Sequence, residues 1–311
     1  MNKLAPIVLF CYNRPWHTEQ TLNALMNNDL ASESELYIYS DGPKPDANSE
    51  DITKIQEVRK VIRMHNWCKE VHIIESDKNK GLANSIIEGV TKIVNDDGNV
   101  IVLEDDIVTS KGFLAYMNDA LTFYKNEEKV MHISGFMFPH TKKLPETFFY
   151  NVPMCWGWAT WDRAWLNFNG DAGYWYQYYS NLNNWEEYNK LGGKYLQKQL
   201  KANVDLTLHT WFIKWHSSTF SRNGYTLFPG VSLVKNIGLD NSGVHSGIHT
   251  KYDSLILTDS ISVEKIEIKE SSLARREIIT FYQGKNYYIK RAIIKLTPEW
   301  IKPFFKNLFK L

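Results

Sequence analysis

Three adjacent acidic residues give the sequence its strongest chemical signal. The apolar residues 100–103 lead directly into Glu104, Asp105 and Asp106. Neighbouring carboxylates at the end of a buried strand repel one another and resist dehydration, so a cation or hydrogen-bond donors must neutralise them. Oxygen ligands suit Mg²⁺ or Mn²⁺, which commonly take one or two carboxylates and complete their shell with phosphate oxygens and water. The residues therefore predict a metal-bound phosphate; the alternative is an acidic turn capping a helix that begins near Lys111.

Cationic side chains are found in two other loops. Arg14 follows the first apolar run of the chain, and Lys78 and Lys80 follow the third. A GxGxxG loop and a Walker loop are both absent from the sequence. The phosphates are therefore expected to be held by the metal and by cationic side chains, which disfavours a dinucleotide-binding dehydrogenase and a P-loop kinase.

Strands and helices alternate over the first 135 residues. This order predicts βαβ units, a mainly parallel sheet and right-handed crossovers. Ligands of such sheets bind beyond the carboxyl ends of the strands, where the charged residues above are placed. The predicted strands are 7–12, 36–40, 71–75 and 100–103, and the predicted helices are 16–28, 49–64 and 82–94.

Four short segments carry a family resemblance: 11–15 (CYNRP), 39–42 (YSDG), 79–82 (NKGL) and 102–106 (VLEDD). Their order resembles nucleotide-sugar glycosyltransferases of the GT-A fold, in particular the N-acetylglucosaminyltransferase I type and bacterial family 2-like enzymes that build surface polysaccharides. The similarity spans about residues 5–250. It implies an α/β, Rossmann-like mixed and mainly parallel sheet flanked by helices, with an aromatic-rich acceptor half. The residue pattern beyond this span adds a basic amphipathic helical tail.

The resemblance also implies a division of the chain and a set of donor-binding residues. The expected parts are a donor-binding half (1–135), an acceptor-binding and catalytic half of the same domain (136–263) and a C-terminal extension (264–311). In the family the last acid of the triplet binds Mn²⁺, which bridges the donor diphosphate. The expected nucleotide-sugar ligands are Arg14, Asp41, Lys80, Glu104, Asp105 and His245, and the expected metal ligand, for Mn²⁺ or Mg²⁺, is Asp106.

Two residues are candidates for the catalytic base. An inverting transfer needs a base that takes the proton of the acceptor hydroxyl. Where the animal enzymes have Asp-Asp-Trp, this chain reads HTW at 209–211, so no carboxylate stands there. His209 has a suitable intrinsic pKa, and Asp205 lies one helical turn earlier, on the same face if the segment is helical. We expect His209 to be the base and Asp205 the second candidate; the alternative for His209 is a partly buried structural histidine.

Aromatic residues are unusually dense in the middle of the chain. Of 11 Trp, eight fall between Trp156 and Trp215. Aromatic faces stack on the C–H faces of sugars, and the indole N–H and phenol O–H add polar contacts. We expect Trp156 and Trp158 at an acceptor site and most other rings in the core; packing of all of them in the core stays the alternative.

The charge distribution concerns partners and compartment. A net charge of +1 gives no reason to expect nucleic acid. Residues 285–311 nevertheless carry seven Lys or Arg and one Glu, and apolar residues at helical spacing face a lysine stripe. Such a helix lies on an anionic membrane or packs on the body of the protein. Three cysteines without paired spacing and the lack of a long apolar run suggest a cytoplasmic protein. The membrane alternative for the tail would make it peripheral on the inner face of the cytoplasmic membrane.

Taken together, the residues and the resemblance predict a metal-dependent glycosyltransferase. It would move a hexosyl or N-acetylhexosaminyl group from a nucleoside-diphosphate sugar, UDP in particular, to a hydroxyl of a glycan or lipid-linked glycan, with inversion, in surface polysaccharide synthesis. A nucleotidyltransferase acting on sugar phosphates is one alternative, although those enzymes usually have a Gly-rich loop near the N-terminus. A non-catalytic carbohydrate-binding protein is another, but it leaves Glu104, Asp105 and Asp106 without a role.

Overall fold

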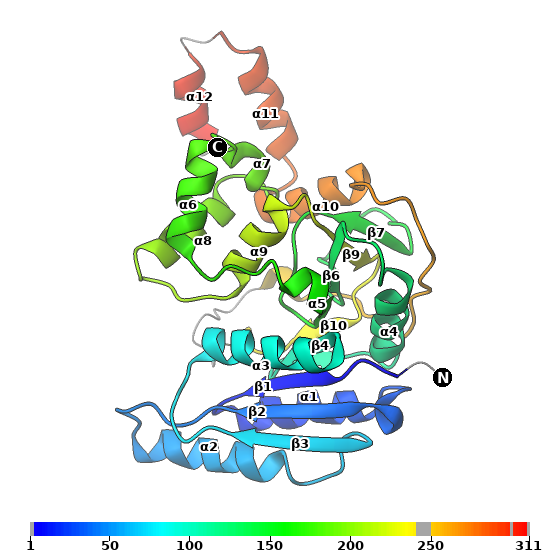
Figure 1. Cartoon of the computed structure of the whole chain (residues 1–311). Helices are drawn as coiled ribbons and strands as arrows, with labels where there is room; N and C mark the ends of the chain where they lie inside the picture. The colour runs from blue at the N-terminus through cyan, green and yellow to red at the C-terminus, as the bar shows by residue number, and fades with distance from the viewer. Residues whose placement is uncertain (1–2, 241–249, 299–300, 310–311) are drawn as a thin grey trace.

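One eight-stranded sheet organises the chain, in the order β3-β2-β1-β4-β8-β6-β9-β7 (Figure 1). The computed structural model describes residues 3–240, 250–298 and 301–309. Strands β1 to β4 are parallel; β8 is antiparallel to both β4 and β6, and β7 is antiparallel to β9. The strands are β1 (Ile7–Cys11), β2 (Glu35–Ser40), β3 (Glu70–Glu75), β4 (Asn99–Glu104), β6 (Val130–Ser134), β7 (Thr147–Tyr150), β8 (Trp158–Trp161) and β9 (Tyr225–Pro229).

The first four strands are connected by helices, as the sequence predicts. Pro15 occupies the first turn of α1, the side chain of Asn48 accepts a hydrogen bond from the backbone N–H of Asp51 in α2, and Gly98 ends α3 in the left-handed region. The helices are α1 (Pro15–Met26), α2 (Ser49–Val61) and α3 (Leu82–Asp97), with a short 3₁₀ segment η1 (Ala31–Glu33) before β2. The predicted mixed α/β architecture with a mainly parallel sheet flanked by helices is confirmed.

A short second sheet follows the acidic residues. Strand β5 (Ile107–Thr109) pairs antiparallel with β10 (Val234–Asn236). Helix α4 (Phe113–Phe123) begins only after β5, and its N-cap residue, Gly112, provides no side-chain cap. The acidic turn therefore leads into a strand and does not cap α4. The pairing brings a segment far along the chain next to Asp106.

The second half of the chain extends the same sheet and covers it with helices. Strands β7, β8 and β9 belong to it, so residues from both halves share one sheet. Trp158 stacks on Trp211 at 4.8 Å between ring centroids, and Trp165 lies 4.9 Å from Trp215, which makes these rings core. The helical segments are α5 (Asp162–Trp165), α6 (Ala172–Asn181), α7 (Trp185–Tyr188), α8 (Tyr195–Val204), α9 (Phe212–Ser221), η2 (Thr250–Tyr252) and α10 (Ser272–Gln283).

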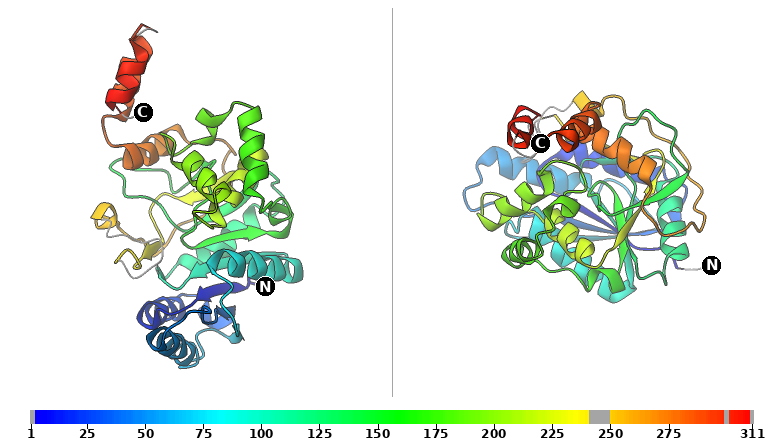
Figure 2. Two further views of the ribbon diagram at one scale, coloured as in Figure 1. Left: turned by 90° about the vertical axis from the view of Figure 1, so that its left-hand side faces the viewer. Right: turned by 90° about the horizontal axis from the view of Figure 1, so that it is seen from above.

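The predicted helical tail forms two helices, α11 (Tyr287–Leu296) and α12 (Lys302–Phe309). Both stand at the end of the molecule farthest from β3 (Figures 1 and 2). Tyr287 is buried, and Arg291 forms an ion pair with Glu186 of α7, so α11 is attached to the body at its start. No helix of the described residues has the length and apolar character needed to cross a membrane.

Candidate functional site

The loops that follow β1, β2, β3 and β4 meet at the carboxyl edge of the sheet. In the parallel register Phe10 is beside Glu104, Cys11 is beside Ser40, and Ser40 is beside Glu75. The residues that follow these ends therefore share one edge, which is where open α/β sheets bind ligands. They include Arg14, Asp41, Lys80 and the three acids, all of which the sequence predicts for this place.

Arg14 joins two of the three acids. Its Nη2 forms an ion pair with Asp105 Oδ1 and lies 2.9 Å from Asp106 Oδ2. Both aspartates are nearly inaccessible, with 5% and 7% exposure. Burial raises the pKa of Asp105 against the opposing effect of Arg14, and burial together with the charges of Asp106 and Asp105 raises the pKa of Glu104 to about 8. The single positive charge of Arg14 therefore does not balance the negative charge of the acidic group.

Asp106 meets a simple test for a metal ligand. Its Oδ1 is buried, and no described residue donates a hydrogen bond to it. A buried carboxylate oxygen without a partner is costly and is relieved by a cation. No group of three His, Cys, Asp or Glu side chains that could hold a metal is present in residues 3–240, 250–298 and 301–309. The fit is therefore to an ion that takes one protein carboxylate and completes its shell with phosphate and water, as Mg²⁺ and Mn²⁺ do.

Residues 237–240 pack directly on the loops that carry Arg14 and Asp106. The backbone N–H of Ile237 donates to the carbonyl of Asp106 at 2.9 Å, and Nε2 of His17 lies 3.1 Å from Oδ2 of Asp240. At Gly238 a Cβ atom would overlap Asp106 Oδ2 and lie 2.6 Å from Arg14 Nη1. Sequence reasoning missed this segment, because only the β5–β10 pairing brings it here.

Asp41 and Lys80 lie at the same edge but contact protein groups. Asp41 accepts hydrogen bonds from the backbone N–H groups of Gly42, Lys80 and Gly81 at 2.8–2.9 Å, and from Asn79 Nδ2 at 3.0 Å. Both carboxylate oxygens therefore organise the loop before α3. Lys80 Nζ lies 2.6 Å from an oxygen of Glu88 on the surface of α3. Contact of either side chain with a nucleotide stays a prediction.

His209 and Asp205 do not share a helix. Helix α8 ends at Val204 and α9 begins at Phe212, so the segment between them is not helical and the expected common face is absent. Asp205 forms an exposed ion pair with Lys201. His209 Nε2 lies 3.3 Å from Oδ1 of Asn84, in the first turn of α3. Partial burial and the charge of Lys214 lower the pKa of His209, which keeps its imidazole neutral and able to accept a proton.

The two predicted acceptor tryptophans differ in depth. Trp158 is fully buried, and it packs between Trp211 and Trp165. Its ring faces no open surface, so the expectation that it contacts an acceptor does not agree with its burial. Trp156 is only partly buried and packs on Phe136 at 4.5 Å and on Tyr252 at 5.0 Å.

Trp156 directly follows Cys155, whose thiol is influenced by the charges of the acidic group. Burial raises the pKa of the Cys155 thiol, and the carboxylates of Glu104 and Asp106 raise it further. Tyr252 and Tyr195 also lie within electrostatic range of Cys155. Tyr252 packs on Trp156, and we call Trp156, Tyr252 and Tyr195 the aromatic wall beside Cys155. The two tyrosines carried no signal in the sequence beyond their aromatic type. His245, predicted in the loop 243–247, lies outside the described residues.

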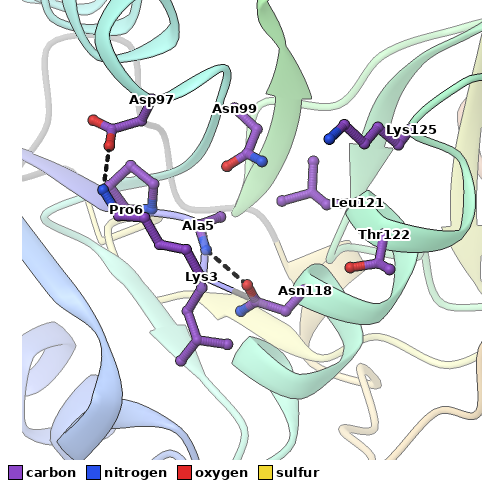
Figure 3. Close-up of a pocket in the computed structure, with 10 residues that line it drawn as sticks. Lys3, Ala5, Pro6, Asp97, Asn99, Asn118, Leu121, Thr122 and Lys125 are labelled. Carbon is purple, nitrogen blue, oxygen red and sulfur yellow. Dashed lines mark hydrogen bonds and ion pairs between the residues drawn. The ribbon is translucent and has the colours of Figure 1, made fainter. Parts of the chain in front are cut away.

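A polar hollow of about 290 Å³ lies elsewhere, at the amino ends of β1 and β4 (Figure 3). Inside it the backbone N–H of Ala5 donates to Asn118 Oδ1 at 2.8 Å, and Lys3 pairs with Asp97 at 2.6 Å. The strands begin here, whereas the acids stand where they end. The hollow is therefore no part of the candidate site. Its lining residues are Lys3, Leu4, Ala5, Pro6, Asp97, Asn99, Asn118, Leu121, Thr122 and Lys125.

No family model and no curated protein sequence matches the chain. Solved structures similar to it include S. aureus TarS 1–349, at TM-score 0.39 and 9% identity over 97% of this chain and 78% of that one. UDP-glucose pyrophosphorylase complexed with UDP-glucose is similar at TM-score 0.35 and 11% identity over 73% and 90%. A second S. aureus TarS structure gives TM-score 0.29 and 15% identity over 46% of this chain; the similar part spans 23% of the length of that TarS chain.

Proposed function

We propose that this protein is a metal-dependent glycosyltransferase. It transfers a hexosyl or N-acetylhexosaminyl group from a nucleoside-diphosphate sugar, UDP in particular, to a hydroxyl of a glycan or lipid-linked glycan, with inversion, in surface polysaccharide synthesis. The observation that carries the proposal is the buried acidic group at the end of β4, in which Arg14 bridges Asp105 and Asp106 and leaves Asp106 Oδ1 without a partner. A divalent cation supplies the positive charge that this edge of the sheet lacks, and the oxygens of a nucleoside diphosphate complete its shell.

The described residues divide the work of such a transfer. Asp106 would hold Mn²⁺ or Mg²⁺, which when bound stabilises the charge of a departing diphosphate. Arg14 orients Asp105 and Asp106 through its two ion pairs. Asp105 and Glu104 then face the nucleoside, and His209, in its neutral form, accepts the proton of the acceptor hydroxyl.

Titration calorimetry with UDP, with and without Mn²⁺, tests the proposal. We expect binding that Mn²⁺ strengthens at least tenfold and that Asp106→Asn reduces to the metal-free value. Asp96→Asn is the matched control. Asp96 is an exposed carboxylate at the end of α3, and the candidate site lies near the start of that helix, so the same charge is removed away from the site. UDP binding that ignores both Mn²⁺ and Asp106→Asn would refute the assignment.

A screen of nucleotide sugars for metal-dependent hydrolysis identifies the donor without knowledge of the acceptor. Release of a nucleoside diphosphate supports glycosyl transfer. Pyrophosphate release from a nucleoside triphosphate and a sugar phosphate would instead assign nucleotidyl transfer. Binding of glycans without turnover of any nucleotide sugar would leave a carbohydrate-binding protein.

The two candidate bases are separated by kinetics. His209→Ala should lower kcat at least a hundredfold, the usual contribution of a general base, with little change in donor KM. Asp205→Ala should leave kcat nearly unchanged, since that side chain is exposed and paired with Lys201. The reverse result would move the role to Asp205, and normal turnover of both variants would remove both.

For the acceptor we propose the aromatic wall beside Cys155. Trp156→Ala should raise the acceptor KM and leave the UDP affinity unchanged, because the ring packs on Phe136 and Tyr252, outside the loops that follow β1 to β4. Phe123→Ala is the control, an exposed aromatic residue at the end of α4 outside this wall. Equal effects of the two substitutions would exclude a specific acceptor role for Trp156.

We also propose that the tail rests on the anionic inner face of the cytoplasmic membrane. Ile289, Ile293 and Leu296 recur at positions i, i+4 and i+7 of α11, and 60%, 40% and 86% of their surface is exposed. Apolar side chains on a basic helix insert into the interface of anionic bilayers. The start of α11 is held to the body by Arg291 and Tyr287, which would bring the body close to that surface.

Sedimentation with vesicles tests this contact. Binding is expected with vesicles containing phosphatidylserine, not with phosphatidylcholine alone, and should be lost on deletion of residues 285–311. Leu296→Asp should weaken it at least fivefold, whereas Leu166→Asp, at an equally exposed leucine on the body, should not. Undiminished binding by the deletion variant would contradict the proposal.

A further inference from the structure

A second hollow, of about 320 Å³, lies away from the acidic edge. It is formed by the loop before α6, by α6 and by the end of α9. Arg222 follows α9 and precedes β9, which runs in the same direction as β4, so it stands at the strand end opposite to Glu104. The lining residues are Asn167, Asn169, Tyr174, Trp175, Tyr178, Ser221 and Arg222.

Aromatic faces make up one side of this hollow. Tyr174 and Tyr178 are one turn apart on α6, and their rings stack at 6.1 Å with 21° between their planes. Nearly half of the surface of Tyr174 is exposed. The indole N–H of Trp175 donates to the carbonyl of Asn169 at 2.9 Å, which fixes the loop against the helix. Flat, half-exposed tyrosine rings on a rigid support suit the C–H face of a sugar ring.

Polar groups with unused hydrogen-bonding capacity make up the other side. Asn167 donates through Nδ2 to the carbonyls of Arg163 and Ala164, which leaves its Oδ1 as an acceptor. Asn169 accepts at Oδ1 from the backbone N–H of Asp171, which leaves its Nδ2 as a donor. An amide acceptor and an amide donor on one loop match the hydroxyls of a sugar.

Arg222 determines the charge of the expected ligand. Within the described part of the chain its guanidinium forms no ion pair, and no Asp or Glu lines the hollow. A guanidinium presents a planar fork that binds a carboxylate through two parallel hydrogen bonds. The hollow therefore favours a negatively charged sugar over a neutral one.

We propose that this hollow is a second carbohydrate site, separate from the acidic edge, that binds a sugar residue bearing a carboxylate. The sugar ring stacks on Tyr174 and Tyr178, the carboxylate pairs with Arg222, and the hydroxyls bond to Asn167 and Asn169. Because the site stands at the other end of the strands, it holds a part of a glycan that is not reacting. The proposal goes beyond the transfer reaction and holds for a binding protein as well as for an enzyme.

Saturation-transfer NMR and calorimetry with glucuronic acid, glucose and inorganic phosphate test the site on the full chain. Glucuronic acid should bind saturably and more tightly than glucose. Arg222→Gln should weaken glucuronic acid at least tenfold and leave glucose unchanged, whereas Tyr174→Ala should weaken both. Arg63→Gln, which removes an equal charge from the surface near β3, should change neither.

Each other outcome overturns a defined part of the inference. Glucuronic acid binding that survives Arg222→Gln removes the carboxylate contact, and a loss that Arg63→Gln reproduces reduces it to net charge. Phosphate that binds as well as glucuronic acid, with the same loss in Arg222→Gln, leaves an anion site without sugar specificity. Absence of saturable binding by any sugar refutes the site, whatever the result with UDP and Mn²⁺. Since Arg222 and Tyr174 are exposed, unchanged thermal melting of both variants confirms that they fold.

Discussion

The ion pair of Arg14 allows a quantitative test of how the acidic edge is held together. Arg14 Nη2 is 2.9 Å from Asp106 Oδ2. The side chains of Arg14, Asp105 and Asp106 are each less than a fifth exposed. At 2.9 Å and an effective dielectric constant of about 20, two unit charges attract by roughly 6 kcal/mol. Much of this attraction offsets the lost hydration of the groups, so the pair itself adds little net stability.

Removal of the arginine alone has a larger effect than the pair's net contribution. Arg14→Met keeps most of the side-chain volume but leaves Asp105 and Asp106 buried without their counter-ion. Breaking a buried ion pair in this way costs about 3–5 kcal/mol in the free energy of unfolding. The second substitution Asp105→Asn removes one of the stranded charges, so we expect Arg14→Met with Asp105→Asn to cost at least about 1.5 kcal/mol less than the sum of the two single changes.

Urea unfolding followed by circular dichroism at neutral pH measures both quantities. Arg63→Met is the matched control: Arg63 is half exposed and pairs with Glu75 at 2.7 Å, and a surface pair of this kind contributes about 0–1 kcal/mol. If Arg14→Met loses no more stability than Arg63→Met, or if the two changes at Arg14 and Asp105 simply add, the charge balance inferred for this edge is wrong.

Two further expectations concern buried groups. Burial lowers the pKa of His132 to about 3 and of His216 to about 4, so the unfolded chain binds protons first and the contribution of these two groups to stability falls as pH drops from about 6.5 towards 4. Together they contribute about 2.7 kcal/mol per pH unit, opposed by about 1.4 kcal/mol per pH unit from Glu104, whose raised pKa makes the folded state bind a proton in the same range. Urea titrations of the protein and of His132→Gln with His216→Gln measure the difference in slope, and equal slopes would show that neither histidine is buried neutral. Gly238→Ala places a methyl group on Asp106, so it should lower the free energy of unfolding by about 1–3 kcal/mol and weaken UDP binding. Gly170→Ala, whose new methyl group meets nothing closer than 3.6 Å, should change neither quantity. Equal effects of the two substitutions would show that the segment around Gly238 is not packed on Asp106.

The strand–helix order of the first half could be predicted because short apolar segments alternate with helical patterns and two of the strands, β1 and β4, are continuous apolar runs. Strands β1 and β4 are buried on both faces and read as unbroken hydrophobic segments, so the residues that follow them could be assigned to one edge in advance. The predicted limits agree with the observed ones or differ by at most three residues, as at α2, which ends at Val61 and not near Met64.

Depth and long-range pairing could not be predicted. Trp156 and Trp158 are the same residue type two positions apart, yet β8 directs Trp158 into the core while Trp156 precedes the strand and stays partly exposed. The approach of Gly238 to Asp106 depends on two three-residue strands, β5 and β10, which are too short to produce a pattern in the sequence. The same limit applies to Asp205 and His209, where a helical spacing occurs without a helix.

The charges at the acidic edge predict how a metal ion and a nucleotide affect each other's binding. One guanidinium, that of Arg14, faces three carboxylates, and the thiol of Cys155 beside them is held protonated by burial and by those same charges. Hydrogen bonds within the protein do not make up the difference, because Asp106 Oδ1 has no donor among the described residues. A ligand that brought only negative phosphate would increase the imbalance, whereas a divalent cation reduces it and gives the diphosphate a positive partner. Metal and nucleotide should therefore bind with positive cooperativity, each strengthening the affinity for the other by the same factor.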